Sequence, residues 1–443
     1  MSGGFGYLAF SALSTLAAAK ETNPLAPRAP HFPARAKRVI FLCMQGGPSH
    51  VDTFDYKPDL NKDTGKQARS FAKLLGSPWE FGRHGESGLP ISSLFPQLAS
   101  HADKLCLINS MHTDLPNHPQ AQTQLHTGNF QFVRPSLGAW TLYGLGSENA
   151  SLPGFITIAP PNGAQNYGSA FLPAIYQGTP VGKQRRNRFA RTGEDSQPIQ
   201  NIENSRLNRD LQRVQLDFVK SLNREKLARE KFHPEVEGII ESFELAFRMQ
   251  DEVPEVLDVA GEPESMKKLY GLDKQETRQF GQQCLVARRM AEAGVRFIEI
   301  THGNWDHHRN LVNSMETNCA EIDQPIAALL SDLESRDMLD ETLVIWAGEF
   351  GRTPHAQGGN GRDHNNKGFS LWMAGGGVKG GLRYGATDEY GYQAVENKVH
   401  IHDWHATILH LMGLDHTKLT YRYAGRDFRL TDVHGNVVTD IVS

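Results

Sequence analysis

Two candidate metal ligands follow an apolar segment in the C-terminal half of this 443-residue sequence. The segment VRFIEIT (295–301) is followed by HGNWDHH, which contains Asp306 and His308. These side chains are two positions apart, so on an extended loop both can point toward one ion while His307 points the other way. Carboxylate oxygens and neutral imidazole nitrogens are ligands that suit zinc, iron or manganese.

A second apolar segment, TLVIWAG (342–348), runs directly into Glu349, and the glycine-rich loop after it ends in Asp363 and His364. Taken singly, an acid or a histidine beside glycine is more often a turn residue than a ligand. A metal site at one edge of a sheet would explain them together, because a divalent cation offsets the repulsion between grouped carboxylates. We interpret Asp363 as a partner that holds an imidazole in place. The expected ligands of a divalent ion (zinc, manganese, iron or calcium) are Asp306, His308, Glu349 and His364.

Three further residues are candidates for the chemistry itself, namely His118, Arg352 and Lys367. His118 follows Asn117, a good N-cap, so it would lie at the positive end of a helix, where an ester oxyanion could bind. We expect His118 to be a nucleophile, a general base or an additional ligand; the alternative is a capped helix with an exposed histidine. Arg352 and Lys367 flank the expected ligands and could hold an anion.

Strands and helices alternate along the chain and must position these residues. Apolar, β-branched runs that end in glycine or polar residues predict strands, and amphipathic patterns between them predict helices. The expected strands lie near 38–44 and within 105–113, 152–160, 295–303, 342–348 and 369–377; the expected helices lie within 205–232, 319–337 and 404–413. This alternation predicts an α/β fold with a mostly parallel sheet covered by helices on both faces. Ligands of such sheets bind beyond the carboxyl ends of the strands.

The composition is that of an ordinary globular protein, with 39% hydrophobic and 22% charged residues. The net charge of −4 gives no support to a general nucleic-acid-binding role. The basic run KQRRNRFAR (183–191) reads as a solvated loop, with an anion-binding arm as the alternative. We expect one α/β domain over 37–443 with a helical elaboration around 160–290; a separate helical cap is the alternative.

The N-terminal 36 residues read as an apolar, export-signal-like segment and a Pro-rich linker. The basic residues that usually begin such a signal are missing from MSGG, so an apolar N-terminal helix is the alternative. We expect the protein to be exported, to a periplasmic or other extracytoplasmic location, with no integral membrane span. The four cysteines (Cys43, Cys106, Cys284 and Cys319) lie far apart and show no CxxC pair, which favours structural thiols.

Several motifs together resemble a known family. QGGPSHVDTFDYKP, NHPQAQTQLHTG, GNWDHH, GEFGRTP, GRDHN and AGGGVKGG occur in the order seen in a large exported bacterial family of unknown function, and the ending GRDFRLTDVHGNVV is also similar. The resemblance runs from about Arg38 to the C-terminus. That family looks like a divergent branch of the alkaline phosphatase–sulfatase superfamily, which implies a three-layer α/β/α sandwich and a two-metal site that hydrolyses phosphate or sulfate esters.

The superfamily ligands match this sequence only in part. Asp306, His308 and His364 resemble the ligands of the first metal site. At the second site, the acid after the first strand is replaced by Gln45, and an Asp-His pair is replaced by Glu349 and Phe350. The nucleophile position falls near His118. A formylglycine sulfatase needs a C/S-x-P/A-x-R motif, and the nearest approach, CLVAR (284–288), lacks the proline.

Two functions from different classes remain. The first is a metal-dependent hydrolase of sulfate or phosphate esters, with an anionic ester substrate that includes an exported-side carbohydrate. The second is a non-catalytic metal- or glycan-binding protein with a degenerate second metal site, which Gln45 and Phe350 favour. The sequence does not give the substrate, the metal or the oligomeric state.

Overall fold

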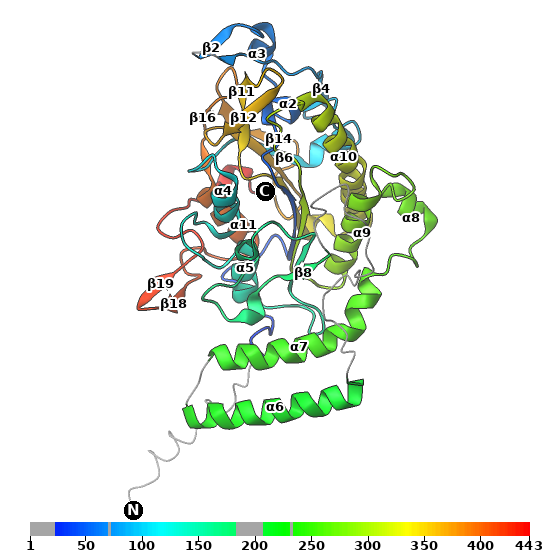
Figure 1. Ribbon diagram of the computed structural model, residues 1–443, viewed down its shortest axis with the longest axis vertical. Coiled ribbons are helices and arrows are strands. Elements are labelled where there is room, and N and C mark those ends of the chain that lie inside the picture. The colour runs from blue at the N-terminus through cyan, green and yellow to red at the C-terminus, as the bar shows by residue number, and fades with distance from the viewer. Residues whose placement is uncertain (1–22, 70–71, 183–206, 231–233) are drawn as a thin grey trace, which may run out of the picture.

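The computed structural model describes residues 23–69, 72–182, 207–230 and 234–443 (Figure 1). The apolar start of the expected export segment, residues 1–22, and the basic run at 183–191 lie outside the described residues. Residues 23–36 lie along two helices of the domain: the Arg28 amide donates to Leu145 O (2.9 Å), and the Arg35 amide donates to Leu411 O (2.8 Å).

A mostly parallel sheet forms the centre of the protein. Within the described residues it has nine strands, of which only β13 runs against its neighbours. The spatial order is β14 (Leu382–Tyr384), β6 (Leu105–His112), β13 (Phe369–Ala374), β10 (Thr342–Ala347), β1 (Arg38–Met44), β9 (Phe297–His302), β7 (Phe155–Ile158) and β8 (Thr179–Val181), with β17 (Val399–His400) also beside β6. The predicted mostly parallel sheet is confirmed.

Helices cover both faces of this sheet (Figure 1). One face carries α4 (His118–Thr127), α5 (Leu137–Leu145) and α11 (Ile401–Leu411), and the other carries α9 (Arg278–Glu292) and α10 (Leu311–Ser335). The predicted three-layer α/β/α sandwich is therefore confirmed. Among the described residues, no helix combines the length and the apolar character that a membrane crossing requires.

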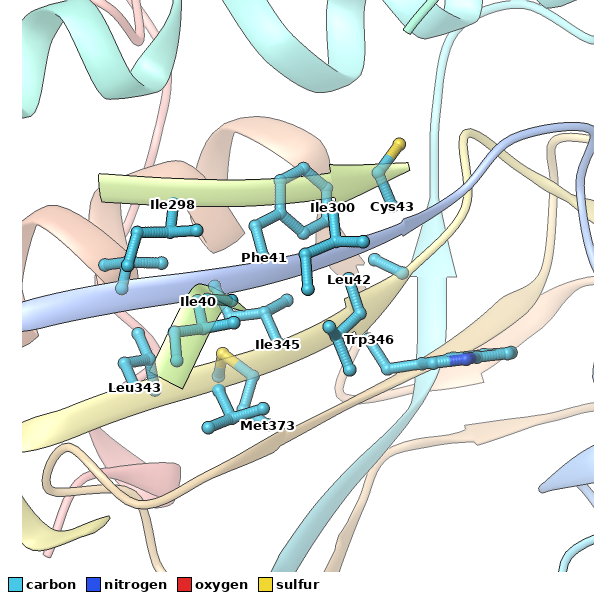
Figure 2. Packing of buried hydrophobic residues seen from close by; sticks show 14 of the residues in the cluster. Ile40, Phe41, Leu42, Cys43, Ile298, Ile300, Leu343, Ile345, Trp346 and Met373 are labelled. Carbon is cyan, nitrogen blue, oxygen red and sulfur yellow. The ribbon is translucent and has the colours of Figure 1, made fainter. Parts of the chain in front are cut away.

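The core is built around β1, whose sequence RVIFLCM is apolar on both faces because helices cover the sheet on both sides. Figure 2 shows its side chains packed with those of β9, β10 and β13. The parallel register aligns Phe41 with Ile345 of β10, and every described residue of β1 after Arg38 is buried. Full burial of one such side chain contributes about 1.5–3 kcal/mol, so β1 fixes the position of the strands whose ends carry the candidate site.

Smaller elements surround the two ends of the sandwich. They are α2 (His50–Thr53), α3 (Pro58–Lys62), and the hairpins β2 (Gln67–Arg69) with β3 (Ala72–Lys73), β4 (Phe81–His84) with β5 (Leu89–Ser92), β11 (Gly351–Gln357) with β12 (Gly361–Asn365), β15 (Ala386–Thr387) with β16 (Ala394–Glu396), and β18 (Tyr421–Tyr423) with β19 (Arg426–Phe428). The hairpin β11–β12 lies at the end of the sheet that carries the site (Figure 1).

Three more helices occupy the region of the predicted elaboration: α6 (Arg209–Glu230), α7 (Pro234–Leu257) and α8 (Glu264–Leu269). α6 and α7 lie side by side at the opposite end of the molecule from β11–β12 (Figure 1). Arg213 of α6 contacts Glu244 of α7 at 2.7 Å. This elaboration is therefore far from the candidate site. Its boundaries as a unit stay a prediction.

Candidate metal centre

Four candidate ligands from three separate parts of the chain meet beyond the carboxyl end of the sheet. Asp306 and His308 lie in the loop between β9 and α10, His118 is the first residue of α4, and His364 lies in β12. One ligand atom from each residue lies within 4.8 Å of the others. The position agrees with the rule that open α/β sheets bind ligands beyond the ends of parallel strands.

A single carboxylate oxygen, Oδ1 of Asp306, is the common point of this group. Nε2 of His118, His308 and His364 lies 3.1, 2.9 and 3.3 Å from it, respectively. Nε2 of His308 is also 2.8 Å from Nε2 of His364. Three imidazole nitrogens are therefore directed at one small volume beside a carboxylate.

The other ring nitrogen of each histidine decides where its proton lies. Each Nδ1 faces an oxygen that accepts a hydrogen bond, so in a neutral imidazole Nδ1 carries the proton and Nε2 has a free lone pair. The three pairs are His118 with Glu349 Oε1 (2.6 Å), His364 with the Pro116 carbonyl (2.8 Å), and His308 with Gln357 Oε1.

Three lone pairs facing a carboxylate oxygen cannot hydrogen-bond to it or to one another. A cation among them satisfies all four groups, and each Nδ1 hydrogen bond is the kind that orients a metal-bound histidine. The residues therefore fit a divalent ion held by three nitrogens and one oxygen. The side chain of Asp306 is 46% exposed, so this centre is open to solvent and to a ligand.

The charges of the metal-free site show why a proton competes with a metal there. Burial alone would lower the pKa of His118, but hydrogen bonds to Asp306 and Glu349 raise it to about 9. Burial would also raise the pKa of Asp306, but hydrogen bonds from His118, His364 and Arg352 hold that pKa well below its usual range. In the absence of a cation, protonated His118 supplies part of the missing positive charge.

Glu349 was expected to bind the metal directly, and the geometry assigns it a different position. Its Oε1 accepts the Nδ1 proton of His118, and its Oε2 accepts from Nε2 of Gln122 at 2.9 Å. The Gly46 amide donates to both oxygens, at 3.0 and 3.1 Å. The carboxylate is fully buried and lies behind the imidazole, so Glu349 is placed to orient His118 and does not belong to the group of four candidate ligands.

Arg352 was expected to bind the substrate anion, and here the structure corrects the prediction. The side chain is fully buried and donates to four backbone carbonyls: Nε to Gly47 (2.8 Å), Nη1 to Arg362 (3.3 Å), Nη2 to Gly46, and Nη2 to Trp305 (3.2 Å). Its Nη2 also donates to Oδ1 of Asp306 at 2.7 Å. Arg352 therefore holds the Asp306 carboxylate in place and has no face open to a ligand.

The other candidates do not belong to this group of four. Lys367 is exposed, and its ammonium lies over the Tyr392 ring, 5.4 Å from the centre of the ring. Asp363 is exposed and accepts the backbone amide of His364 at 2.8 Å. His307 points away from the centre, as alternation predicts, and lies buried 3.4 Å from Asn318 of α10.

Phe350 and Gly46 shape the wall of the centre. The Phe350 ring is buried and lies 4.7 Å from the ring of His118 and 4.8 Å from that of His364, so it closes one side with apolar surface. Gly46 has a φ of +121°, and a Cβ there would lie 2.7 Å from the backbone nitrogen of Asp306. Only glycine allows this close approach.

Sequence reasoning missed the residues that orient the imidazoles. Pro116, Gln122 and Gln357 were not among the candidates, because a backbone carbonyl or a side-chain amide that accepts or donates one hydrogen bond has no distinctive sequence pattern. Gln122 had one available signal: it lies four residues after His118 on the same helix, so both must face the same side.

Comparison with known proteins finds solved structures with a low similarity to this chain. Solved structures that this chain resembles include the PsFucS1 sulfatase from Pseudoalteromonas sp. (14% identity, 92% of this chain and 71% of that chain, TM-score 0.37), Ps i-CgsB in complex with k-i-k-neocarrahexaose (10%, 85% and 72%, 0.36) and a protein in the alkaline phosphatase superfamily from Vibrio parahaemolyticus (9%, 89% and 71%, 0.35). At these TM-scores, residue roles are taken from the geometry of this chain alone.

Among curated proteins, no sequence matches this chain. A family model does match, over residues 36–442, which is nearly the whole of the chain. Its description agrees with the predicted family of unknown function. The chain belongs to the family described as Protein of unknown function (DUF1501).

Proposed function

We propose that this protein is a metal-dependent hydrolase of sulfate or phosphate esters. One observation carries the proposal: three imidazole lone pairs meet at Oδ1 of Asp306, in a position open to solvent. A catalytic metal centre needs protein ligands on one side and an open position on the other. A divalent ion bound there would polarise an ester oxygen and lower the pKa of a bound water.

The residues of the chain would hold this centre ready for an anionic ester. Glu349 fixes the Nδ1 proton of His118, and Arg352 fixes Asp306, so the ligand atoms are oriented before a metal arrives. Phe350 excludes water from one side of the two imidazoles that it contacts. In the reaction, a water oxygen attacks the phosphorus or sulfur atom, and the ester oxygen leaves with a proton as an alcohol.

A polar cavity near the centre supports a carbohydrate as the group that carries the ester. The cavity has a volume of about 430 Å³ and is lined by Asp114, His400, His402, Asp403, Val433, His434, Gly435 and Asn436. Asp114 lies two residues before Pro116, the acceptor for His364. Burial lowers the pKa of His402 to about 4, so its imidazole is neutral. Carboxylates, imidazoles and amides suit hydroxyl groups.

The observation that favours a non-catalytic metal- or glycan-binding protein is the position of the arginines. Arg352 is buried against Asp306, and Arg362 is buried against Asp52 at 2.7 Å. Neither can neutralise a substrate anion, which leaves that task to the metal ion and to Lys367. Binding without turnover is therefore the outcome that separates the two functions.

The test is to purify the protein, measure bound metals, and assay aryl phosphates and aryl sulfates. We expect turnover that Asp306→Asn abolishes together with the metal of this centre, while His84→Ala in β4, a histidine outside the ligand group, leaves both unchanged. Metal at this centre without turnover on either ester class would favour the binding protein. A protein that binds no metal through Asp306 would exclude both functions.

We also propose that the protein is exported, because the apolar N-terminal segment followed by a Pro-rich stretch has the pattern of an export signal. A fusion of residues 1–36 to a reporter that is active only outside the cytoplasm tests this. Reporter activity supports export, and activity that persists after charged residues replace the apolar run would contradict it.

A further inference from the structure

A second group of metal-ligating side chains lies inside the protein, beneath α4. Cys43 of β1, His126 of α4 and Glu299 of β9 each place one ligand atom within 4.8 Å of the others. Nε2 of His126 is 2.9 Å from Glu299 Oε1 and 3.9 Å from the Cys43 sulfur. None of the three side chains is more than 3% exposed.

The sheet register explains how these residues meet. β1 and β9 are parallel neighbours in which Cys43 is aligned with Thr301, and Glu299 lies two positions before Thr301 on the same face. Figure 2 shows the Cys43 sulfur on the same side of β1 as the Phe41 ring. That ring lies 5.8 Å from the His126 ring, so this side faces α4.

Polar atoms around the group lack partners, which is the second observation that indicates a ligand. Within the described chain, Oε2 of Glu299 and the hydroxyls of Thr301 and Thr157 are buried without a hydrogen-bond partner. Thr157 of β7 is aligned with Glu299 across the sheet, so the three atoms belong to one region. A buried polar atom that stays unsatisfied destabilises the fold, and together these atoms indicate a polar occupant.

We propose that Cys43, His126 and Glu299 form a buried zinc site, separate from the centre at Asp306. Zinc binds sulfur, imidazole nitrogen and carboxylate oxygen, and structural zinc sites are closed to solvent. A thiolate and a carboxylate together offset the charge of Zn²⁺, which makes burial of the ion tolerable. The Thr301 hydroxyl or one water would complete four ligands.

Formation of the site releases the proton of the Cys43 thiol and, from the ion-paired form of His126, also the proton at Nε2. Burial, followed by the negative charges of Glu299 and Glu349, raises the pKa of the Cys43 thiol well above its ordinary value, so without a metal the sulfur keeps its proton. Zinc binding exchanges the S–H bond for a Zn–S bond and sends that proton to solvent. Because the site is closed, zinc would enter while the chain folds.

A metal-free ion pair is the competing arrangement. His126 could donate from Nδ1 to the Gln122 carbonyl, at 2.7 Å, and from Nε2 to Glu299. This arrangement leaves the Cys43 thiol with a hydrogen bond to the Gln122 side chain, and it leaves Glu299 Oε2 without a partner. A bound cation uses all three groups.

Cobalt replacement of the native metal tests the proposal on the full chain. A thiolate bound to Co²⁺ gives a sulfur-to-metal charge-transfer band in the near ultraviolet, which the histidine and aspartate ligands of the Asp306 centre cannot give. We expect the refolded, cobalt-loaded protein to show this band and to bind two equivalents of metal. Cys43→Ala should lose the band and one equivalent, while Cys106→Ala, which removes a buried thiol from β6, should keep both.

The two centres can be separated in the same experiment. Asp306→Asn should lose the other equivalent and keep the band, so failure of the proposed ester hydrolysis would leave this result unaffected. A cobalt-loaded wild-type protein without the band overturns the proposal, and so does a Cys43→Ala protein that keeps it. If Cys43→Ala does not fold, the wild-type spectrum alone decides.

Discussion

α4 carries two histidine–glutamate pairs that differ in their access to solvent. His118 contacts Glu349 at 2.6 Å, and His126 contacts Glu299 at 2.9 Å, two helical turns farther along the same face. Gln122 lies midway and joins the two pairs. Its side-chain amide donates to Glu349, and its backbone carbonyl faces Nδ1 of His126. The same helix and the same side-chain types therefore build an outer pair and an inner pair.

The difference between the pairs lies in what each histidine meets on its other side. Nε2 of His118 meets Asp306, whose side chain is 46% exposed, whereas His126 meets only buried groups. An open site can exchange a ligand and do chemistry, whereas a closed site can only stabilise. The comparison shows that exposure to solvent, and not the type of side chain, distinguishes the His118 pair from the His126 pair.

The largest expected effect is on the outer pair. Asp306→Asn removes the charged oxygen that all three imidazoles share, so we expect metal affinity at this centre to fall by more than the roughly 100-fold typical of a residue outside the ligand sphere. Ester hydrolysis should be lost with it. The asparagine oxygen can still accept from Arg352, so the fold should remain. Metal analysis, an ester assay and thermal unfolding test this; full metal content at this centre would contradict it.

The inner pair should respond through stability. Glu299→Ala removes the carboxylate that faces Nε2 of the buried His126, and removal of one charged partner from such a buried group costs about 3–5 kcal/mol, whether a zinc ion or a proton balances the charge. Urea unfolding measures the change in the free energy of unfolding. Glu321→Ala is the matched control, because Glu321 forms a half-exposed pair with His302 at 3.0 Å and should cost less than about 1 kcal/mol. Equal effects would mean that the inner pair has no special role.

Glu349→Gln sharpens the assignment of Glu349 as an orienting residue. A glutamine accepts the Nδ1 proton of His118 less strongly, so we expect metal affinity to fall by roughly 10–100-fold. Competition with a chelator measures the change. A loss as large as that of Asp306→Asn would show instead that Glu349 binds the metal directly.

The pH dependence of metal binding should report the proton on His118. A metal must displace that proton, and the pKa of His118 in the metal-free protein is raised to about 9 by Asp306 and Glu349 against the effect of burial. Metal affinity should therefore rise about tenfold per pH unit up to pH 9. His118→Gln should remove this slope, and an unchanged slope would assign the proton elsewhere.

The proton on His118 opposes metal binding, but it stabilises the fold of the metal-free protein. Because the pKa of His118 is raised from 6.5, its protonation stabilises the metal-free protein fully below pH 6.5. This stabilisation is lost as the pH rises from 6.5 to about 9. Thermal unfolding of metal-free protein across this range should show the loss, and metal-loaded protein should not.

Local patterns in the sequence predicted the fold and part of the centre. Apolar runs with clear ends predicted the strands, and alternation after β9 predicted that Asp306 and His308 face one point while His307 faces away. These features depend only on neighbours along the chain, which is why they could be predicted.

The remaining features depend on contacts between distant segments. Glu349 appeared to be a ligand because it ends a strand, but Gly46 and Gln122, both more than 200 positions earlier in the chain, take its oxygens. Cys43 was interpreted as a structural thiol, because the apolar run around it indicates burial. The sequence gives no sign that His126 and Glu299 are its neighbours. Which side chain meets which depends on the tertiary structure and cannot be predicted from neighbours along the chain.

Arg352 also affects how firmly the outer centre would hold its ion. Its guanidinium and a bound cation use the same oxygen of Asp306, so the two positive charges compete for the electron density of one atom. The carboxylate then donates less to the metal than an unpaired one would. A centre of this kind exchanges its ion more readily than three nitrogens and one oxygen would otherwise allow, so the metal it carries would follow the supply of ions around the protein.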